Sequence, residues 1–425
     1  MNIIIKNTNL LAMTDCKIEK TNIYIKDDQI VHIGDDYKLK IDREIDGSNY
    51  ITMPGFINAH THTAMSYFRN YGNDNDLMTW LNDYIFPAEE KLNDEIVYNA
   101  SLLSMAEMIK SGTTCFADMY FFEASTIKAL EKSKMRAQIS RGLSSPDEAN
   151  ERLNENIKLY KDFNGLNGKL EIALGPHAIY TTDLDYLKQI SKAAEKYNMP
   201  IHTHLSETRI ENDQCYQKYG KSPTEIYNEC GIFDNRTIAA HGIYLSDKDM
   251  EILRDKNVSI IHNPKSNLKL SSGICDVPKL REFGINVGLG TDSASSNNKQ
   301  SMLAEIEYAS LLAKLKGAEK LKAYEVLQMA TVNNAKALGI YDKVGSLETG
   351  KKADLIMIDI DNINHRPEND LIASICYSTY ESDIKLVMIG GDIVYENGKF
   401  KYLDLQEIKE AANELSRLLI WLELI

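Results

Sequence analysis

The chain has 425 residues, of which 43% are apolar and 26% charged, and its formal net charge is −14. This length exceeds that of one compact core and fits a barrel of about 250 residues plus a smaller domain. The acidic balance argues against nucleic-acid and anionic-membrane partners, because phosphate binding needs clustered lysine and arginine. It does not exclude an anionic group on a small substrate.

The cysteines and the N-terminus bear on the cellular location. The six cysteines are scattered and form no C-x-x-C pair, so we expect reduced thiols in a cytoplasmic protein. The apolar run at residues 2–5 is too short for the core of a signal peptide. No stretch of about 20 apolar residues occurs, so no membrane span is expected.

The two ends of the chain share a β-rich pattern. Residues 2–5, 22–25 and 30–33 are expected to be strands, with Asp27-Asp28 as a hairpin turn. The pattern returns at residues 353–360, 384–389 and 392–395, where Gly390-Gly391 fits a two-residue turn. We therefore predict that residues 1–53 and 345–425 form one small β domain.

The chain closes with a predicted amphipathic helix. Its apolar residues share one face at helical spacing. They are Ile408, Ala411, Ala412, Leu415, Leu419 and Leu422. Trp421 and the residues after it are expected to pack on a neighbouring element.

Between residues 54 and 344 short β-rich segments alternate with helical patterns, which is typical of a parallel α/β architecture. Eight such segments occur, at residues 55–60, 114–119, 137–141, 170–175, 201–205, 237–241, 258–262 and 287–291. Eight strands of this kind predict a (β/α)₈ TIM barrel, inserted between the two halves of the β domain.

The histidines cluster at the predicted carboxyl ends of these strands, where TIM barrels hold their active sites. Seven of the nine histidines lie there: His60, His62, His177, His202, His204, His241 and His262. Only His32 and His365 do not. Such a concentration predicts a metal or catalytic site at this end of the barrel.

The spacing favours a metal site. His60 and His62 are two residues apart, so an extended strand presents both to one face. His204 is preferred as the third nitrogen ligand because it lies nearer its strand end than His202, which is expected to be buried one layer deeper. Asp292 supplies an oxygen ligand, with a helix N-cap as the alternative reading.

This ligand set also predicts the kind and the number of ions. Three histidines, one aspartate and a water suit Zn²⁺ first and Fe²⁺ second. A barrel with two metals usually needs a bridging ligand, such as a carboxylated lysine, from the fourth strand. Residues 170–177 offer no lysine at the strand end. We therefore expect one ion.

Several stretches resemble the amidohydrolase superfamily and, more narrowly, the deaminases of 5-methylthioadenosine and S-adenosylhomocysteine. The resemblance covers nearly the whole chain. The stretches are residues 54–62, Ser111-Gly112-Thr113-Thr114, Gly175-Pro176-His177, His204-Leu205-Ser206-Glu207, Ala240-His241-Gly242, residues 262–270 and Gly290-Thr291-Asp292-Ser293. The resemblance implies a β-sandwich built from both chain ends, and a homo-oligomer.

The resemblance also implies catalytic roles. It assigns the metal to the same four residues, Glu207 to proton transfer and His241 to orienting the attacking hydroxide, which Asp292 also holds. The stretch at residues 267–270 is expected to be a loop that shapes the pocket. No role is evident for His262.

The residues implied in substrate binding come from four separate places. Glu89 matches the carboxylate that binds the ribose 2′- and 3′-hydroxyls, Trp80 lines the pocket and His177 contacts the ring. Arg141 and Arg152 match a pair that holds the homocysteine carboxylate. Glu89 on a solvated helix face and a purely structural Arg152 are the alternatives, whereas a buried Arg141 demands an anion.

The implied reaction is hydrolytic deamination of the adenine ring of S-adenosylhomocysteine and 5-methylthioadenosine to the inosine analogue and ammonia. Deaminases of guanine, 8-oxoguanine, cytosine or an s-triazine, and chlorohydrolases, are alternatives. An adenosine or 5′-deoxyadenosine deaminase would use Glu89 but not the arginine pair. An inactive barrel that acts as an interaction protein would have lost metal ligands. A zinc deaminase of the base-editing type is excluded because C-x-x-C is absent.

Overall fold

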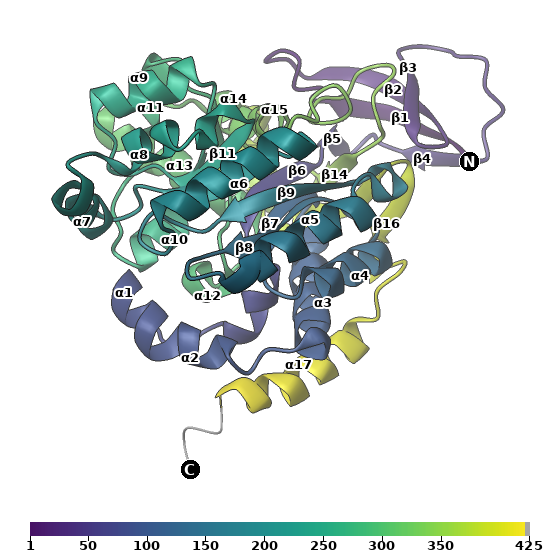
Figure 1. Cartoon of the computed structure of the whole chain (residues 1–425). Coiled ribbons are helices and arrows are strands. Elements are labelled where there is room, and N and C mark those ends of the chain that lie inside the picture. Colours follow the sequence, from purple (N-terminus) through teal and green to yellow (C-terminus); the bar gives the residue numbers. More distant parts are fainter. Residues whose placement is uncertain (421–425) are drawn as a thin grey trace.

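The computed structural model of the chain describes residues 1–420 and contains two β-sheets, of which the central one is surrounded by helices (Figure 1). One sheet comes from the middle of the chain and the other from its two ends. The predicted positions of Trp421 and Leu422 lie outside the described residues. Among the described helices, none combines the length and the apolar character that a bilayer crossing requires.

The central sheet is an eight-stranded parallel barrel whose strands are neighbours in chain order. Its strands are β6 (Phe56–Thr61), β7 (Thr113–Tyr120), β8 (Arg136–Leu143), β9 (Leu170–Pro176), β10 (Ile201–Leu205), β11 (Thr237–His241), β12 (Ser259–His262) and β13 (Val287–Leu289). All eight predicted strands are confirmed, and so is the fold class. All residues of these strands are buried except Arg141 and Glu171, which are half-buried, as expected for a parallel sheet covered by helices.

Helices alternate with these strands and cover the barrel (Figure 1). They are α3 (Asp94–Lys110), α4 (Glu123–Ser133), α5 (Glu151–Phe163), α6 (Leu184–Tyr197), α7 (Arg209–Tyr219), α8 (Pro223–Glu229), α9 (Asp247–Asp255), α11 (Val277–Glu282), α12 (Ala294–Asn297), α13 (Met302–Ala313), α14 (Ala323–Met329), α15 (Val332–Ala337) and α16 (Leu371–Tyr377). Polar side chains start several of them: Asn93 accepts from the Ile96 amide and Asp183 from the Tyr186 amide.

One segment after β6 forms a wall above the barrel mouth. It consists of η1 (Thr63–Phe68), α1 (Leu77–Thr79), the π-helix η2 (Trp80–Ile85) and α2 (Phe86–Glu89). Asp76 accepts from the amides of Met78 and Thr79 and so starts α1. The wall buries its apolar residues in a cluster with Tyr120 of β7 and Leu270.

The chain ends form one nine-stranded sheet within residues 1–420. Its strands are β1 (Asn2–Leu10), β2 (Glu19–Lys26), β3 (Gln29–Ile33), β4 (Arg43–Asp46), β5 (Tyr50–Pro54), β14 (Leu355–Asp359), β15 (Ile384–Ile389), β16 (Asp392–Glu396) and β17 (Lys399–Phe400). The two halves meet where β5 pairs with β14. Gly390 and Gly391 have φ of 59° and 73° between β15 and β16, which a type I′ turn requires.

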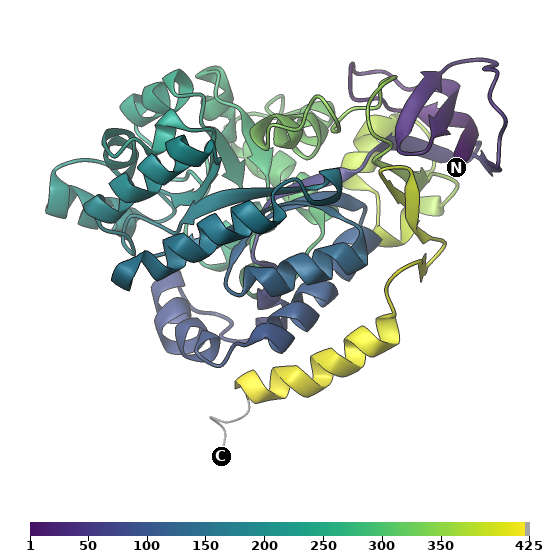
Figure 2. The ribbon, with the colours of Figure 1, turned by 45° about the vertical axis from the view of Figure 1, so that its right-hand side comes forward.

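The predicted C-terminal helix is present as α17 (Leu405–Ile420). It runs along α3, on the side of the barrel away from the β1–β3 strands (Figures 1 and 2). Ile408 and Leu419 are buried, and Ala412 and Leu415 are half-buried, so the predicted apolar face is the packed face.

The prediction of a loop at residues 267–270 is wrong. The stretch begins in a short helix, α10 (Pro264–Lys269). Pro264 occupies the first helical turn, where its missing N–H costs nothing and its fixed φ favours the helix. Leu270 follows the helix and still lines the cavity described below.

The barrel closes between its first and last strands through asparagine side chains. Asn334 of α15 donates Nδ2 to the carbonyls of Ile57 (2.5 Å) and Leu289 (2.7 Å) and accepts from the Leu289 amide (3.0 Å). Asn58 accepts from the Thr291 amide at 2.9 Å. All these groups are buried, so the side chains replace the ladder bonds that a continuous sheet would make.

We expect Asn334→Ala to reduce the free energy of unfolding by about 2–4 kcal/mol, because it orphans buried backbone groups on both strands. Urea and thermal unfolding measure this. Asn333→Ala is the graded control: this half-buried neighbour makes one such bond, to Val287 O at 2.9 Å, and should cost about 1 kcal/mol. Equal effects of the two substitutions would contradict the role of Asn334 in closing the barrel.

Candidate metal centre and active site

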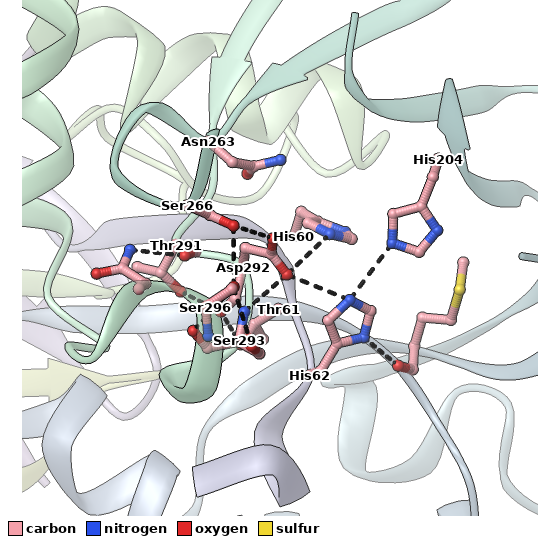
Figure 3. Close-up of polar contacts among 12 residues, drawn as sticks. His60, Thr61, His62, His204, Asn263, Ser266, Thr291, Asp292, Ser293 and Ser296 are labelled. Carbon is pink, nitrogen blue, oxygen red and sulfur yellow. Dashed lines mark hydrogen bonds and ion pairs between the residues drawn. The ribbon is translucent and has the colours of Figure 1, made fainter. Parts of the chain in front are cut away.

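Four side chains from three strand ends converge at the mouth of the barrel (Figure 3). His62 Nε2 lies 3.4 Å from His204 Nε2 and 3.3 Å from Asp292 Oδ1. His60 Nε2 lies 3.6 Å from the same carboxylate oxygen. These are the four residues predicted as metal ligands, and the structure brings all of them together.

The far nitrogens of two of these rings are held by backbone carbonyls. His62 Nδ1 donates to Met119 O at 2.5 Å, and His204 Nδ1 donates to His177 O at 2.8 Å. A carbonyl only accepts, so each Nδ1 carries a proton, and Nε2 is the nitrogen that the neutral ring can offer to a metal. A ring held in this way is oriented to coordinate a metal through Nε2.

His60 is held by the histidine expected one layer deeper. His60 Nδ1 lies 2.8 Å from His202 Nε2, and both rings are fully buried. His60 Nε2 is buried too and has no hydrogen-bond partner among residues 1–420. An orphaned buried nitrogen costs free energy unless something coordinates it. This nitrogen and its neighbours therefore fit a divalent ion with nitrogen and oxygen ligands.

Asp292 points its carboxylate at the histidines because of an unusual backbone. Its φ is +60°, in the left-handed region. Ser266 Oγ donates to Oδ2 at 2.5 Å, and the Ser293 amide donates to Oδ1 at 2.7 Å. Burial alone would raise the pKa of Asp292, but contacts with the two histidines hold it well below its usual range. The N-cap reading is wrong, since Ser293 caps α12.

His241, at the end of β11, faces the same centre. Its Nε2 lies 3.6 Å from Glu207 Oε2, and its Nδ1 lies 2.8 Å from Asn267 Oδ1. Its nitrogen comes within 4.8 Å of those of His60 and His204, so these three also form a group that could hold an ion. The ring thus lies between the predicted ligands and Glu207.

Glu207 is buried after β10, and burial raises the pKa of its carboxyl. Ser272 Oγ donates to Oε1 at 3.1 Å. Its own backbone amide donates to Glu211 Oε2 at 2.7 Å, and the amide of Ser206 donates to Glu211 Oε1 at 3.1 Å. Glu211 therefore fixes the turn that carries Glu207. Sequence reasoning missed Glu211 and Ser272, although Glu211 lies one turn after Glu207 at the start of α7.

A cavity of about 250 Å³ opens above this cluster. Eight of the site residues predicted from the sequence line it: His62, His177, His204, Glu207, His241, Asp292, Trp80 and Glu89. Apolar side chains of the wall segment, among them Met65, Leu77 and Ile85, form much of the remaining surface. A largely apolar cavity with a few converging polar groups is typical of a small-molecule site.

Glu89 lies in this cavity, whereas its neighbour Glu90 is exposed. Tyr120 donates its hydroxyl to Glu89 Oε1 at 2.7 Å. Burial raises the pKa of Glu89 to about 7, against the opposing effect of that hydrogen bond. Glu89 therefore lies in the cavity and not on a solvated helix face, which was the alternative interpretation of the sequence.

Two further predicted contacts line the cavity. Trp80 is buried at the start of the π-helix. His177 Nδ1 lies 2.9 Å from Thr181 Oγ1, and burial lowers the pKa of His177 to about 4, so its ring is neutral near pH 7. His262 is also buried, with its pKa lowered to about 3 by burial, but it does not line the cavity.

The predicted arginine pair does not line the cavity. Arg141 donates Nε to Glu155 Oε2 at 2.9 Å and also donates to Gly142 O. Arg152 donates to Ser144 O at 2.8 Å. The residues that the arginines contact, Gly142 and Ser144, do line it. The anion that a buried arginine demands is therefore Glu155 in this structure.

The chain matches the amidohydrolase family over residues 51–394. It is 44% identical to the 5-methylthioadenosine/S-adenosylhomocysteine deaminase of Thermoanaerobacter pseudethanolicus, over 98% of this chain and 100% of that protein. It is 40% identical to the 5′-deoxyadenosine deaminase of Methanosphaera stadtmanae, over 97% and 99%. An adenosine deaminase structure from Xanthomonas campestris with bound zinc superposes with a TM-score of 0.95 at 27% identity, over 98% of each chain.

We expect removal of a bound divalent ion by a chelator to lower the melting temperature, because an ion that binds only the folded cluster of histidines and Asp292 stabilises the folded state. Calorimetry and metal analysis measure this, and added Zn²⁺ should restore both. His204→Asn should hold far less metal. His32→Asn, a change in the chain-end sheet, should bind metal as the wild type does. Equal metal content in the two variants would count against the cluster.

Proposed function

The chain belongs to the amidohydrolase family, and we propose that it hydrolytically deaminates the adenine ring of S-adenosylhomocysteine and 5-methylthioadenosine. The products are the inosine analogue and ammonia. The observation that carries this proposal is the shared cavity: residues of the histidine–aspartate cluster, Glu207 and Glu89 all line it. The names of the relatives at about 40% identity and above agree with it.

We propose that one divalent ion is held by His60, His62, His204 and Asp292. Zn²⁺ is preferred, and Fe²⁺ is the alternative. The orphaned His60 Nε2 and the carbonyl-bound Nδ1 atoms support this. The related adenosine deaminase contains zinc. When bound, such an ion makes hydroxide available at neutral pH, because it lowers the pKa of a bound water towards about 7.

Glu207 is proposed to transfer the proton. It takes a proton from the attacking water and delivers it to N1 of the purine, which makes C6 electrophilic. His241 and Asp292 orient the water towards C6. Its oxygen adds to C6, the second water proton passes to the amino group, and the C6–N bond breaks to release ammonia. A carboxyl that both accepts and donates a proton works best with a pKa near the working pH. The buried position of Glu207 raises its pKa in that direction.

The nucleoside is proposed to lie between the two sides of the cavity. Glu89 accepts hydrogen bonds from the ribose 2′- and 3′-hydroxyls, His177 contacts the purine and Trp80 covers it. Since burial keeps His177 neutral, it can offer a hydrogen bond without adding a charge. A free base would need no carboxylate at the position of Glu89.

Arg141 and Arg152 are proposed to bind the carboxylate of the homocysteine tail. Both contact residues of the cavity lining, but Arg141 is paired with Glu155. Glu155 is 44% exposed, and an exposed ion pair is worth only about 1 kcal/mol or less. A substrate carboxylate can therefore replace Glu155 at small cost.

A 5′-deoxyadenosine deaminase is the second candidate. One observation favours it: both arginines are engaged within the protein, and a substrate without a charged tail would leave them so. A relative of that name is 40% identical.

We also propose that the protein is a cytoplasmic homo-oligomer. Residues 1–53 and 345–425 are proposed to form its β domain, and the residues between them the barrel.

We expect the metal-loaded protein to turn over S-adenosylhomocysteine and 5-methylthioadenosine faster than adenosine, and guanine not at all. Purine absorbance and ammonia release measure this. Glu207→Gln is the matched control: it should retain the metal, and its kcat should fall about 10²–10⁴-fold or more. Arg141→Met and Arg152→Met should lower turnover of S-adenosylhomocysteine only. Failure of every adenosine derivative would overturn the nucleoside assignment and direct the search to free bases and triazines.

We also expect the KM for 5-methylthioadenosine to rise as the pH falls below about 7. The pKa of Glu89 is about 7, so above this pH the ionised carboxylate accepts both sugar hydroxyls, and below it one oxygen carries a proton. Initial rates from pH 5.5 to 8.5 measure KM. Glu89→Gln cannot ionise, so its KM should be raised about 10- to 100-fold and should lack this pH dependence. The same pH dependence of KM in both proteins would rule out Glu89 as its source.

A further inference from the structure

We propose that Tyr120 is a positioning residue that fixes Glu89 for the sugar and thereby sets the preference for ribosides over 2′-deoxyribosides. This rests on the proposed function, in which Glu89 binds the ribose hydroxyls. Tyr120 does not act on the reacting atoms. Its effect reaches the substrate through one hydrogen bond.

The geometry of this bond fixes the carboxylate of Glu89 and still leaves acceptor sites for the ligand. Tyr120 is the last residue of β7 and is 4% exposed, and its hydroxyl donates to Glu89 Oε1 at 2.7 Å. Burial raises the pKa of Tyr120 well above its usual range, so the hydroxyl remains a donor at every working pH. The bond uses one lone pair of Oε1, so Oε2 and the second lone pair of Oε1 remain as acceptors for the two sugar hydroxyls.

Glu89 needs such a partner because it stands at the end of its helical segment. It is the last residue of α2, a helix of four residues that continues the π-helix η2. A long side chain at a helix end loses rotamer freedom when it binds a ligand. The bond from Tyr120 restricts the carboxylate before the ligand arrives, which is preorganisation.

The same strand end also holds a predicted metal ligand. Met119 O accepts from His62 Nδ1 at 2.5 Å, and the next residue holds Glu89. The rings of His62 and Tyr120 have centroids 6.2 Å apart. Two consecutive residues of one buried strand thus set the positions of the metal side and the sugar side of the cavity. We infer that β7 fixes the distance between the reacting ring and the sugar hydroxyls.

Tyr67 provides a matched control. It is also 4% exposed and belongs to the same apolar cluster as Tyr120. Its hydroxyl is buried and has no hydrogen-bond partner among the described residues. Tyr67→Phe therefore removes a buried hydroxyl of the same kind without touching Glu89.

The test compares adenosine with 2′-deoxyadenosine in the metal-loaded enzyme. In Tyr120→Phe we expect the KM for adenosine to rise about 5- to 10-fold, with kcat within about threefold and the metal content unchanged. In Tyr120→Phe the ratio of kcat/KM for adenosine to kcat/KM for 2′-deoxyadenosine should fall towards the ratio found in Glu89→Gln. The double variant Tyr120→Phe/Glu89→Gln should lose no more of the preference for adenosine than Glu89→Gln alone, because both changes act on one interaction. Tyr67→Phe should keep the wild-type ratio.

Three outcomes would overturn the inference: an unchanged ratio in Tyr120→Phe, equal losses for both nucleosides, or additive losses in the double variant. KM does not depend on how much of a preparation is folded, so a less stable variant still gives an answer. Tyr120→His, which retains a donor, should recover part of the preference. If the wild type acts on no adenosine derivative, the proposed function fails as well, whereas normal wild-type turnover with an unchanged Tyr120→Phe removes only this inference.

Discussion

The closure of the barrel between β6 and β13 is the interaction on which the site depends. His60 and His62 stand at the end of β6, and Asp292 follows β13, so these groups meet only if the first and last strands are joined. The Asp292 amide donates to His60 O at 3.0 Å, and Asn334 joins the strands further down. A change of register at this junction would separate the predicted ligands, which lie close enough together to bind one ion.

Each polar group at the centre is held by a partner on the side away from the cavity. Carbonyls hold His62 and His204, Ser266 holds Asp292, and Glu211 holds the turn of Glu207. Buried polar groups are costly unless they are bonded, so these partners also stabilise the fold. His60 Nε2, which has no such partner in the described part of the chain, is the atom left free for the proposed ion. Without an ion this nitrogen lowers the stability of the fold.

The sequence was sufficient for the parts of the site that follow from local patterns. The eight strands could be predicted because each is a short β-rich run between helical patterns, and the His60-x-His62 pair because residues two apart share one face of a strand. Contacts between distant segments could not: Tyr120 with Glu89, and Arg141 with Glu155, depend on how a wall segment and a helix are placed. The helix α10 was missed because its few residues give too short a period to detect.

The residues proposed for the reaction and those proposed for substrate specificity come from different parts of the fold. The predicted metal ligands stand on buried strand ends, whereas Trp80 and Glu89 come from the short helices of the wall. That wall packs between the barrel and α17: Leu419 is buried in its apolar cluster, and Lys91 donates to Leu419 O at 3.1 Å. The C-terminal helix therefore shapes the substrate cavity without reaching it. Changes in α17 or the wall can alter which nucleoside fits while the ligand cluster stays intact, which allows related chains to keep one reaction and change its substrate.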